Sequence, residues 1–100
     1  MKVLLVSASP RRGGNTFTAL NEVKKTLESD GIDTELVELG AKPVRGCIAC
    51  NGCRRDPDKH RCVFDDDICN AISEKAETAD AFVFGAPVYY GVPNVTAMAL

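Results

Sequence analysis

The chain has 100 residues, 45% of them hydrophobic and 26% charged, and a formal net charge of −2 at pH 7. This composition is typical of a globular protein, and the length predicts a single domain over residues 1–100. The weakly acidic balance, without a basic stripe among aromatic residues, argues against a nucleic-acid partner. No apolar run approaches the ~18 residues of a membrane span, and the first is too short for a signal peptide, so we expect a cytoplasmic protein without membrane contact.

The first forty residues have the pattern of a βαβ unit. A short apolar run predicts a buried strand over residues 2–6. Apolar residues at helical spacing then predict a helix from Thr16 to Ser29, and Gly31 is suited to the position just beyond its end. Residues 34–39 predict the second strand. The crossover between these parallel strands is expected to be right-handed.

The loop between the first strand and the first helix, residues 7–16, has the composition of a phosphate-binding site. Backbone N–H groups without partners and the helix dipole favour an anion at a helix N-terminus. Gly13 and Gly14 let the backbone approach a ligand closely. Polar side chains of the loop add further donors: Ser7, Ser9, Arg11, Arg12, Asn15 and Thr16. The loop matches neither G-x-G-x-x-G nor the P-loop pattern, and an ordinary polar turn is the alternative.

A segment without clear periodicity, residues 40–65, holds four of the five cysteines: Cys47, Cys50, Cys53 and Cys62. Loops of this length are usually functional or disordered. An odd number of cysteines in a reducing compartment argues against a disulfide framework. Three cysteines at two-residue gaps, with a fourth on a returning loop, suit an iron–sulfur cluster. Zinc usually takes two separated pairs, and it stays open here together with free or redox-active thiols.

Asp65, Asp66 and Asp67 precede a second helical pattern. Carboxylates at a helix start cap free N–H groups and interact favourably with the dipole, so we assign them to a cap rather than to a metal site. The inward stripe of this helix is predicted to comprise Ile68, Ala71, Ile72, Ala76, Ala79 and the stem of Lys75. Cys69 is expected to be a small core residue, and His60 an exposed loop residue.

Residues 81–85 predict a third strand, apolar throughout and therefore covered on both faces. A loop punctuated by glycine and proline, residues 86–94, leads to another helix from residue 95. Three βα units predict an α/β protein with a doubly wound parallel sheet. With strand order 2-1-3, the ligand-binding switch point lies between loops 7–16 and 86–94. A ligand with a phosphate at one end and a flat aromatic system at the other, such as FMN, fits these two loops.

Three motifs follow one another along essentially the whole chain: Ser9-Pro10-Arg11-x-x-Gly14-Asn15-Thr16, Gly46-Cys47-x-x-Cys50-x-x-Cys53 followed by Cys62, and Pro87-Val88-Tyr89-Tyr90-Gly91. Together they resemble the NAD(P)H-dependent FMN reductase superfamily and, within it, the iron–sulfur flavoproteins. The resemblance implies a flavodoxin-like fold with bound FMN. It implies phosphate binding by Ser9, Arg11, Gly14, Asn15 and Thr16. It implies contacts to the flavin ring from Pro87, Val88, Tyr89, Tyr90 and Gly91.

The resemblance further implies an oxidoreductase that transfers electrons from NAD(P)H, or from a reduced protein such as ferredoxin, through FMN to a small quinone-like acceptor. A [4Fe-4S] cluster would have as its ligands Cys47, Cys50, Cys53 and Cys62. Members are commonly homodimers or homotetramers, and no catalytic side chain is implied. Two other classes stay open: a flavodoxin-type electron carrier without turnover, and a zinc-binding module.

The chain departs from the family pattern in two ways. The gap of eight residues before Cys62 is somewhat longer than in relatives that hold a cluster. Only three of the five strands of a flavodoxin-like sheet are predicted, and the loop after the fourth strand is absent. An apolar edge at residues 82–84 would then be exposed, which natural proteins avoid. We therefore expect a longer chain, or a partner that covers this edge.

Overall fold

The strands and helices follow the predicted order closely. The computed structural model describes residues 1–58 and 61–100, and the prediction for His60 lies outside them. Its elements are β1 (Lys2–Ser7), α1 (Asn15–Ser29), β2 (Asp33–Glu38), the 3₁₀ helix η1 (Gly52–Arg54), α2 (Cys69–Glu77), β3 (Ala81–Gly85), β4 (Val88–Tyr89), β5 (Val92–Pro93) and α3 (Val95–Ala99). No helix in the described ranges is long and apolar enough to cross a membrane.

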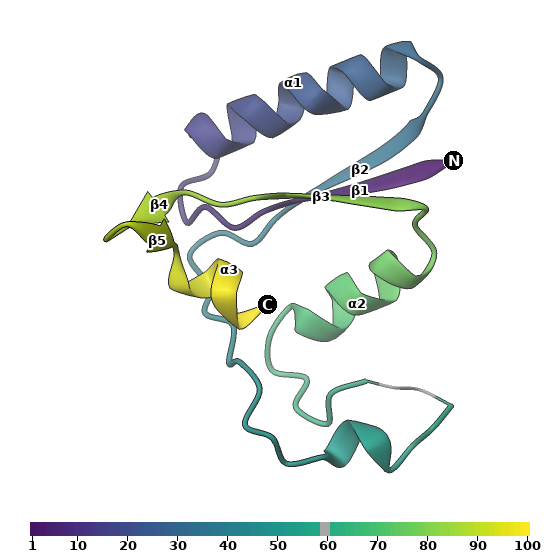
Figure 1. The fold of residues 1–100 in the computed structure, drawn as a ribbon, viewed down its shortest axis with the longest axis vertical. Helices are drawn as coiled ribbons and strands as arrows, with labels where there is room; N and C mark the ends of the chain where they lie inside the picture. The colour runs from purple at the N-terminus through teal and green to yellow at the C-terminus, as the bar shows by residue number, and fades with distance from the viewer. Residues whose placement is uncertain (59–60) are drawn as a thin grey trace.

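The main sheet has three parallel strands in the order β2-β1-β3, which confirms the predicted α/β fold and strand order. In the central register, Leu5 of β1 pairs with Leu36 of β2 and Val83 of β3. At the carboxyl end, Ser7 pairs with both Glu38 and Gly85. The loops that follow β1 and β3 therefore begin side by side at one edge of the sheet (Figure 1).

Helices cover the two faces of this sheet, with α1 on one side and α2 and α3 on the other (Figure 1). β1 is buried on both faces, as expected for a central parallel strand. The core on the α1 side consists of Val3, Leu5 and Leu20. The core on the opposite side consists of Leu4, Val6, Ala8, Leu39, Ile72 and Ala97.

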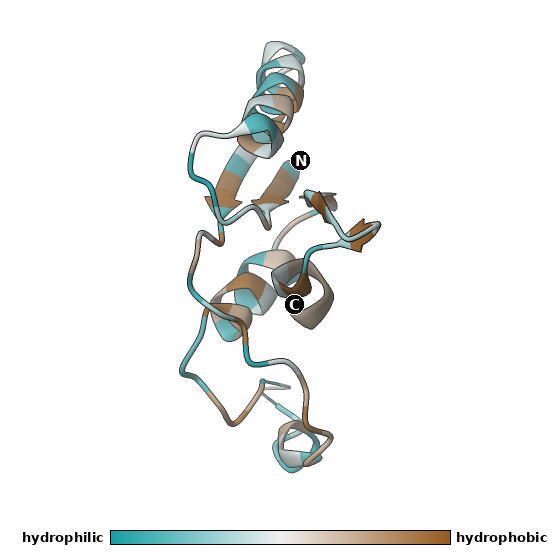
Figure 2. Ribbon diagram, turned by 90° about the vertical axis from the view of Figure 1, so that its left-hand side faces the viewer, coloured by the Kyte–Doolittle hydropathy of each residue, from teal (hydrophilic) through white to brown (hydrophobic). Residues whose placement is uncertain are grey.

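The segment between β2 and α2 begins in the core with Leu39 and Val44, and its later described residues extend away from the sheet and from the β4–β5 hairpin (Figures 1 and 2). In its described part, the only regular element is the short helix η1. This agrees with the missing periodicity of residues 40–65. The predicted cysteine ligands thus lie on a long connecting segment and not at the carboxyl edge of the sheet.

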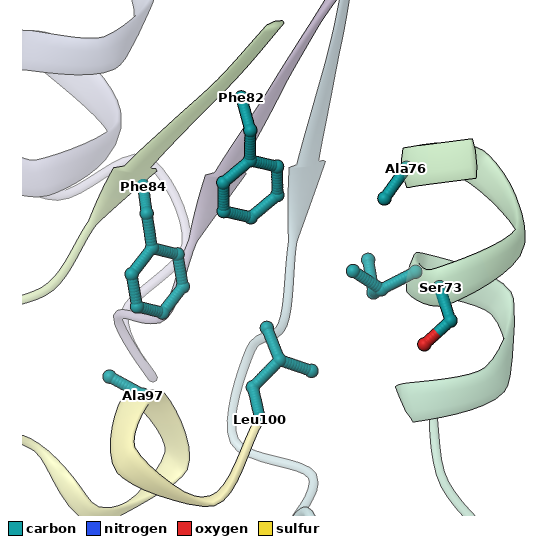
Figure 3. Close-up of a pocket in the computed structure, with 7 residues that line it drawn as sticks. Ser73, Ala76, Phe82, Phe84, Ala97 and Leu100 are labelled. Carbon is teal, nitrogen blue, oxygen red and sulfur yellow. The ribbon is translucent and has the colours of Figure 1, made fainter. Parts of the chain in front are cut away.

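The prediction that β3 is covered on both faces is wrong. Val83 packs toward α1, but Phe82 and Phe84 on the other face are 48% and 41% exposed. Their rings stack with centroids 5.9 Å apart and line an apolar hollow of about 290 Å³ between β3, α2 and α3 (Figure 3). The reason is that α2 and α3 are short, and only one edge of β3 is paired in the described residues.

Glu35 of β2 forms ion pairs with two lysines, one on α2 and one on the neighbouring strand β1. Its carboxylate lies 2.6 Å from Nζ of Lys75 on α2 and 3.8 Å from Nζ of Lys2 on β1. The hydrogen bond from Lys75, supported by the charges of both lysines, lowers the pKa of Glu35. A carboxyl group whose pKa is lower in the folded state stabilises the fold above its unfolded pKa of about 4.3.

We therefore expect Glu35→Gln to destabilise the protein at pH 7, by up to about 1 kcal/mol as for other exposed ion pairs. The difference from the wild type should disappear as the pH falls through the lowered pKa of Glu35, because the wild-type carboxyl is then also neutral. Urea unfolding of both proteins at pH 7 and near pH 2.5 measures this. An equal difference at both pH values would contradict the assignment.

Candidate cofactor site at the carboxyl edge of the sheet

The loops after β1 and β3 enclose a pocket of about 200 Å³ at the carboxyl edge of the sheet. Its lining consists of Ser9, Arg11, Gly14, Asn15, Thr16, Pro87 and Tyr89. The structure therefore brings all five predicted phosphate-binding residues together with two of the predicted ring contacts. The other predicted ring contacts, Val88, Tyr90 and Gly91, are outside this lining and lie along the hairpin.

The start of α1 offers unpaired donors to this pocket. Gly14 occupies the N-cap, where no side chain caps the helix, and the first turn contains no acidic residue. The first helical bond runs from the N–H of Thr18 to the carbonyl of Gly14, at 2.9 Å. The N–H groups of residues 15–17 therefore have no carbonyl partner within the helix. Together with the helix dipole, they favour an anion such as a phosphate.

Two adjacent arginines in this loop have different environments. Arg12 lies 3.7 Å from a carboxylate oxygen of Glu38, and the other oxygen of Glu38 accepts the N–H of Gly13 at 3.2 Å. Arg11 has no ion-pair partner among the described residues, and it lines the pocket. Its backbone is held by a turn in which its N–H donates to Oγ of Ser9, at 3.2 Å. Arg11 is therefore the available cation of the site.

Gly85 allows the two halves of the site to approach each other. A Cβ at this position would lie 2.9 Å from Cδ1 of Leu20 and 3.1 Å from Cγ2 of Thr16. The first turns of α1 thus pack directly onto the end of β3. Sequence analysis did not single out Gly85, although a glycine at a strand end is a known signal of close backbone approach.

The loop after β3 contains a small antiparallel hairpin that was not predicted. Val88 pairs with Pro93 and Tyr89 with Val92. The connecting residues, Tyr90 and Gly91, have φ values of 54° and 77°, as a two-residue hairpin turn of the primed type requires. The hairpin exposes its apolar and aromatic side chains, and Figure 2 shows brown, hydrophobic segments in its two strands.

The four predicted metal ligands are all exposed: Cys47, Cys50, Cys53 and Cys62. Across residues 1–58 and 61–100, no three His, Cys, Asp or Glu side chains are grouped closely enough to hold a metal ion. The donor types suit an iron–sulfur cluster, but the four thiols are not gathered around one point in the described residues.

The backbone around the first two cysteines nevertheless points donors at sulfur. Sγ of Cys47 accepts the N–H of Ala49, and Sγ of Cys50 accepts the N–H of Gly52, each at 3.4 Å. Ala49 and Asn51 adopt left-handed conformations with φ of 59°, which are uncommon outside glycine. Hydrogen bonds to the cysteine sulfurs are among the features by which proteins adjust a bound iron–sulfur cluster.

The prediction that the aspartate run caps α2 is not confirmed in its usual form, because the N-cap is Ile68, no side chain forms a cap hydrogen bond there, and the aspartates have other partners. Oδ1 of Asp67 accepts the N–H of Cys69 at 2.9 Å, and Oδ2 accepts the N–H of Arg45 at 2.8 Å. Asp66 forms an ion pair with the Arg45 guanidinium, which lowers the pKa of Asp66 and also lies 4.6 Å from the centre of the Phe64 ring. These contacts fasten the beginning of the cysteine segment to its end.

Asn70 holds the backbone of Cys62 at two points. Oδ1 of Asn70 accepts the N–H of Cys62, and Nδ2 of Asn70 donates to the carbonyl of Cys62, both at 2.9 Å. Nδ2 also donates to Asp65, at 3.1 Å. Sequence analysis gave no sign of this contact. It fixes the position of the fourth predicted cysteine relative to α2.

Cys69 differs from the other four cysteines. It is only partly buried, on the first turn of α2, so its prediction as a core residue is wrong. Burial raises the pKa of its thiol, and the neighbouring carboxylate of Asp67 adds to this effect. At neutral pH this thiol is therefore protonated and weakly nucleophilic.

We expect Asp67→Ala to destabilise the protein by about 1–2 kcal/mol, because it removes the acceptor for the N–H of Cys69 at the start of α2. Asp67→Asn should recover part of this loss, since asparagine caps as well as aspartate but has one acceptor oxygen instead of two. Urea unfolding of the three proteins measures the effect. Equal stability of Asp67→Ala and the wild type would show that the two hydrogen bonds accepted by Asp67 do not stabilise the fold.

The parallel sheet with strand order 2-1-3 and a pocket at its switch point define a protein of the flavodoxin-like class. The chain belongs to the family described as NADPH-dependent FMN reductase, which matches residues 1–97. It is 37% identical over 91 residues to an iron-sulfur flavoprotein of Methanocaldococcus jannaschii, covering 91% of this chain and 45% of the relative.

Two further relatives carry the same description. An iron-sulfur flavoprotein of Methanosarcina thermophila is 36% identical over 91 residues, covering 91% of this chain and 46% of the relative. One of Archaeoglobus fulgidus is 35% identical over 97 residues, covering 97% of this chain and 41% of the relative. The chain thus spans less than half the length of the curated relatives that it matches. No solved structure matched the chain.

Proposed function

We propose that this chain binds FMN between the loops after β1 and β3, as part of an oxidoreductase that passes electrons from NAD(P)H or a reduced carrier protein to a small acceptor. The observation that carries the proposal is the pocket lined by all five predicted phosphate-binding residues. Membership of the FMN reductase family supports the identity of the ligand.

Each part of the pocket would have a distinct role. The free N–H groups at the start of α1 and the Arg11 guanidinium would bind the phosphate, and the hydroxyls of Ser9 and Thr16 would complete its hydrogen bonds. Pro87 and Tyr89 would contact the ligand from the other loop and orient the ring. Bound FMN would supply the hydride- and electron-transfer chemistry, and the protein the binding and orientation.

Turnover separates this proposal from a simple electron carrier. The intact protein, loaded with FMN, should oxidise NADPH in the presence of a quinone acceptor faster than the same concentration of free FMN does. A rate equal to that of free FMN, with FMN still bound, would instead favour the flavodoxin-type carrier.

We further propose that Cys47, Cys50, Cys53 and Cys62 bind a [4Fe-4S] cluster in the intact protein. The descriptions of the relatives support this, as do the N–H groups directed at the sulfurs of Cys47 and Cys50. Iron and zinc assays on anaerobically purified protein test it. About four irons per chain are expected, and stoichiometric zinc or no metal would reject it.

The proposal includes a homodimer or homotetramer. The hairpin and α3 expose a set of apolar and aromatic residues that would be covered in an assembly: Val88, Tyr90, Val92, Val95 and Met98. Exposed apolar patches of this kind mark interaction sites. Light scattering of the intact protein gives the number of chains.

Free thiols in every described cysteine are consistent with a cytoplasmic location, which is also part of the proposal.

A further inference from the structure

Asn94 joins the two loops of the pocket across 86 positions of sequence. Its Nδ2 donates to the carbonyl of Ala8, at 2.7 Å. Asn94 is 6% exposed and Ala8 is fully buried, so water does not compete for this bond. Ala8 is the residue immediately before Ser9 at the pocket, and Asn94 is the last residue of the loop that contributes Pro87 and Tyr89.

The side chain of Asn94 does not perform the usual task of its position. Asn94 is the N-cap of α3, where an asparagine oxygen normally accepts an N–H from the first turn. Here no side-chain cap bond forms, and Oδ1 is buried without a partner among the described residues. Helix capping therefore does not explain the orientation of this side chain. A buried acceptor without a hydrogen bond is unfavourable, so the bond from Nδ2 to Ala8 is the interaction that this orientation provides.

The surrounding backbone bonds show what the contact fastens. The N–H of Ala8 donates to the carbonyl of Gly85, the last residue of β3, at 2.9 Å. The N–H and the carbonyl of Ala8 are therefore bound to the two ends of the β3–α3 connection, at Gly85 and at Asn94. The N–H of Asn94 donates to the carbonyl of Pro87 at 3.1 Å and closes that connection at its base. The Asn94 amide therefore links a closed loop to the residue at which the other loop begins.

We propose that Asn94 is a positioning residue that sets the loop after β3 against the loop after β1 before the ligand binds. The inference rests on the proposed FMN site, because it concerns a ligand that contacts both loops. Such a ligand gains affinity when the loops are already held in place, since less ordering is required on binding. A ligand that contacts one loop gains much less.

The test compares three variants of the intact protein. Asn94→Ala removes the amide. Asn94→Ser also removes the contact to Ala8, but it keeps a residue that caps helices well, so it separates capping from the link between the loops. Thr96→Ala is the control, since Thr96 lies on the same helix turn and its side chain forms no hydrogen bond within the described residues. FMN and inorganic phosphate are each titrated into the apoprotein, and the thermal midpoint is recorded.

We expect Asn94→Ser and Asn94→Ala to weaken FMN binding at least tenfold, while phosphate affinity changes less than threefold and Thr96→Ala leaves both affinities unchanged. Both Asn94 variants should lower the thermal midpoint, because each leaves the buried carbonyl of Ala8 without its donor, and Asn94→Ser should lower it less, because serine can still cap α3. If Asn94→Ser binds FMN as the wild type does, or loses FMN and phosphate affinity equally, the inference is wrong and the FMN site stands. If the wild type itself does not bind FMN, the proposed function fails and the inference fails with it.

Discussion

Replacing Arg11 by alanine is expected to weaken FMN binding roughly 10- to 100-fold, the range of one hydrogen bond between charged groups. Arg11 lines the pocket and has no ion-pair partner among the described residues. Its guanidinium is therefore free to pair with a phosphate. Titration of the apoprotein with FMN, followed by flavin fluorescence, measures the dissociation constant.

Arg12→Ala is the matched control for this prediction. Arg12 has the same charge and a neighbouring position, but it is paired with Glu38. Its replacement should change FMN affinity less than about threefold at moderate ionic strength, where exposed charges are largely screened. If the two variants lose the same affinity, FMN senses only the net charge of the loop, and the distinct role of Arg11 is rejected.

The second large effect is expected from Gly85→Ala. The added Cβ would lie 2.9 Å from Cδ1 of Leu20, a core side chain that is 5% exposed. Overpacking of this kind usually costs about 1–3 kcal/mol. It should also displace the first turn of α1 and weaken FMN binding, because Thr16 lies on the same turn. Urea unfolding measures the loss of stability, and titration with FMN measures the change in its dissociation constant.

A double variant identifies the cause of the Gly85→Ala effect. Leu20→Ala alone should cost about 2–5 kcal/mol, as other large-to-small core replacements do. The double variant Leu20→Ala/Gly85→Ala should lose less stability than the sum of the two single variants, since the smaller side chain at position 20 leaves room for the new Cβ. A coupling of at least about 1 kcal/mol is expected for residues in contact. Strictly additive costs would show that Gly85 is not constrained by Leu20.

The sheet and its strand order could be predicted because they depend on local patterns. An apolar run before a polar loop, and helical periodicity after it, were enough to place β1, α1 and β2 within one residue or so of their ends. The cover over β3 could not be predicted in this way. The apolar run at residues 81–85 predicts a buried strand, but it contains no information on which elements cover Phe82 and Phe84.

The site was predictable as two loops but not in its internal contacts. The family resemblance selected Arg11 and not Arg12, but the physical reason could not be predicted, because it depends on Glu38 at the end of another strand. The hairpin at residues 88–93 was missed because Tyr90-Gly91 lacks the usual Asn-Gly or Asp-Gly signal. The role of Asn94 depends on a contact with Ala8, which only the folded chain brings near.

The most direct test of the FMN site is a titration of the intact apoprotein with FMN and, in parallel, with riboflavin, which lacks the phosphate. If the loop after β1 binds the phosphate, FMN should bind at one site per chain and at least tenfold more tightly than riboflavin. Equal affinities would show that the pocket of Ser9, Arg11, Gly14, Asn15 and Thr16 is not a phosphate site. Binding of neither ligand would contradict the assignment of this chain as an FMN-binding protein.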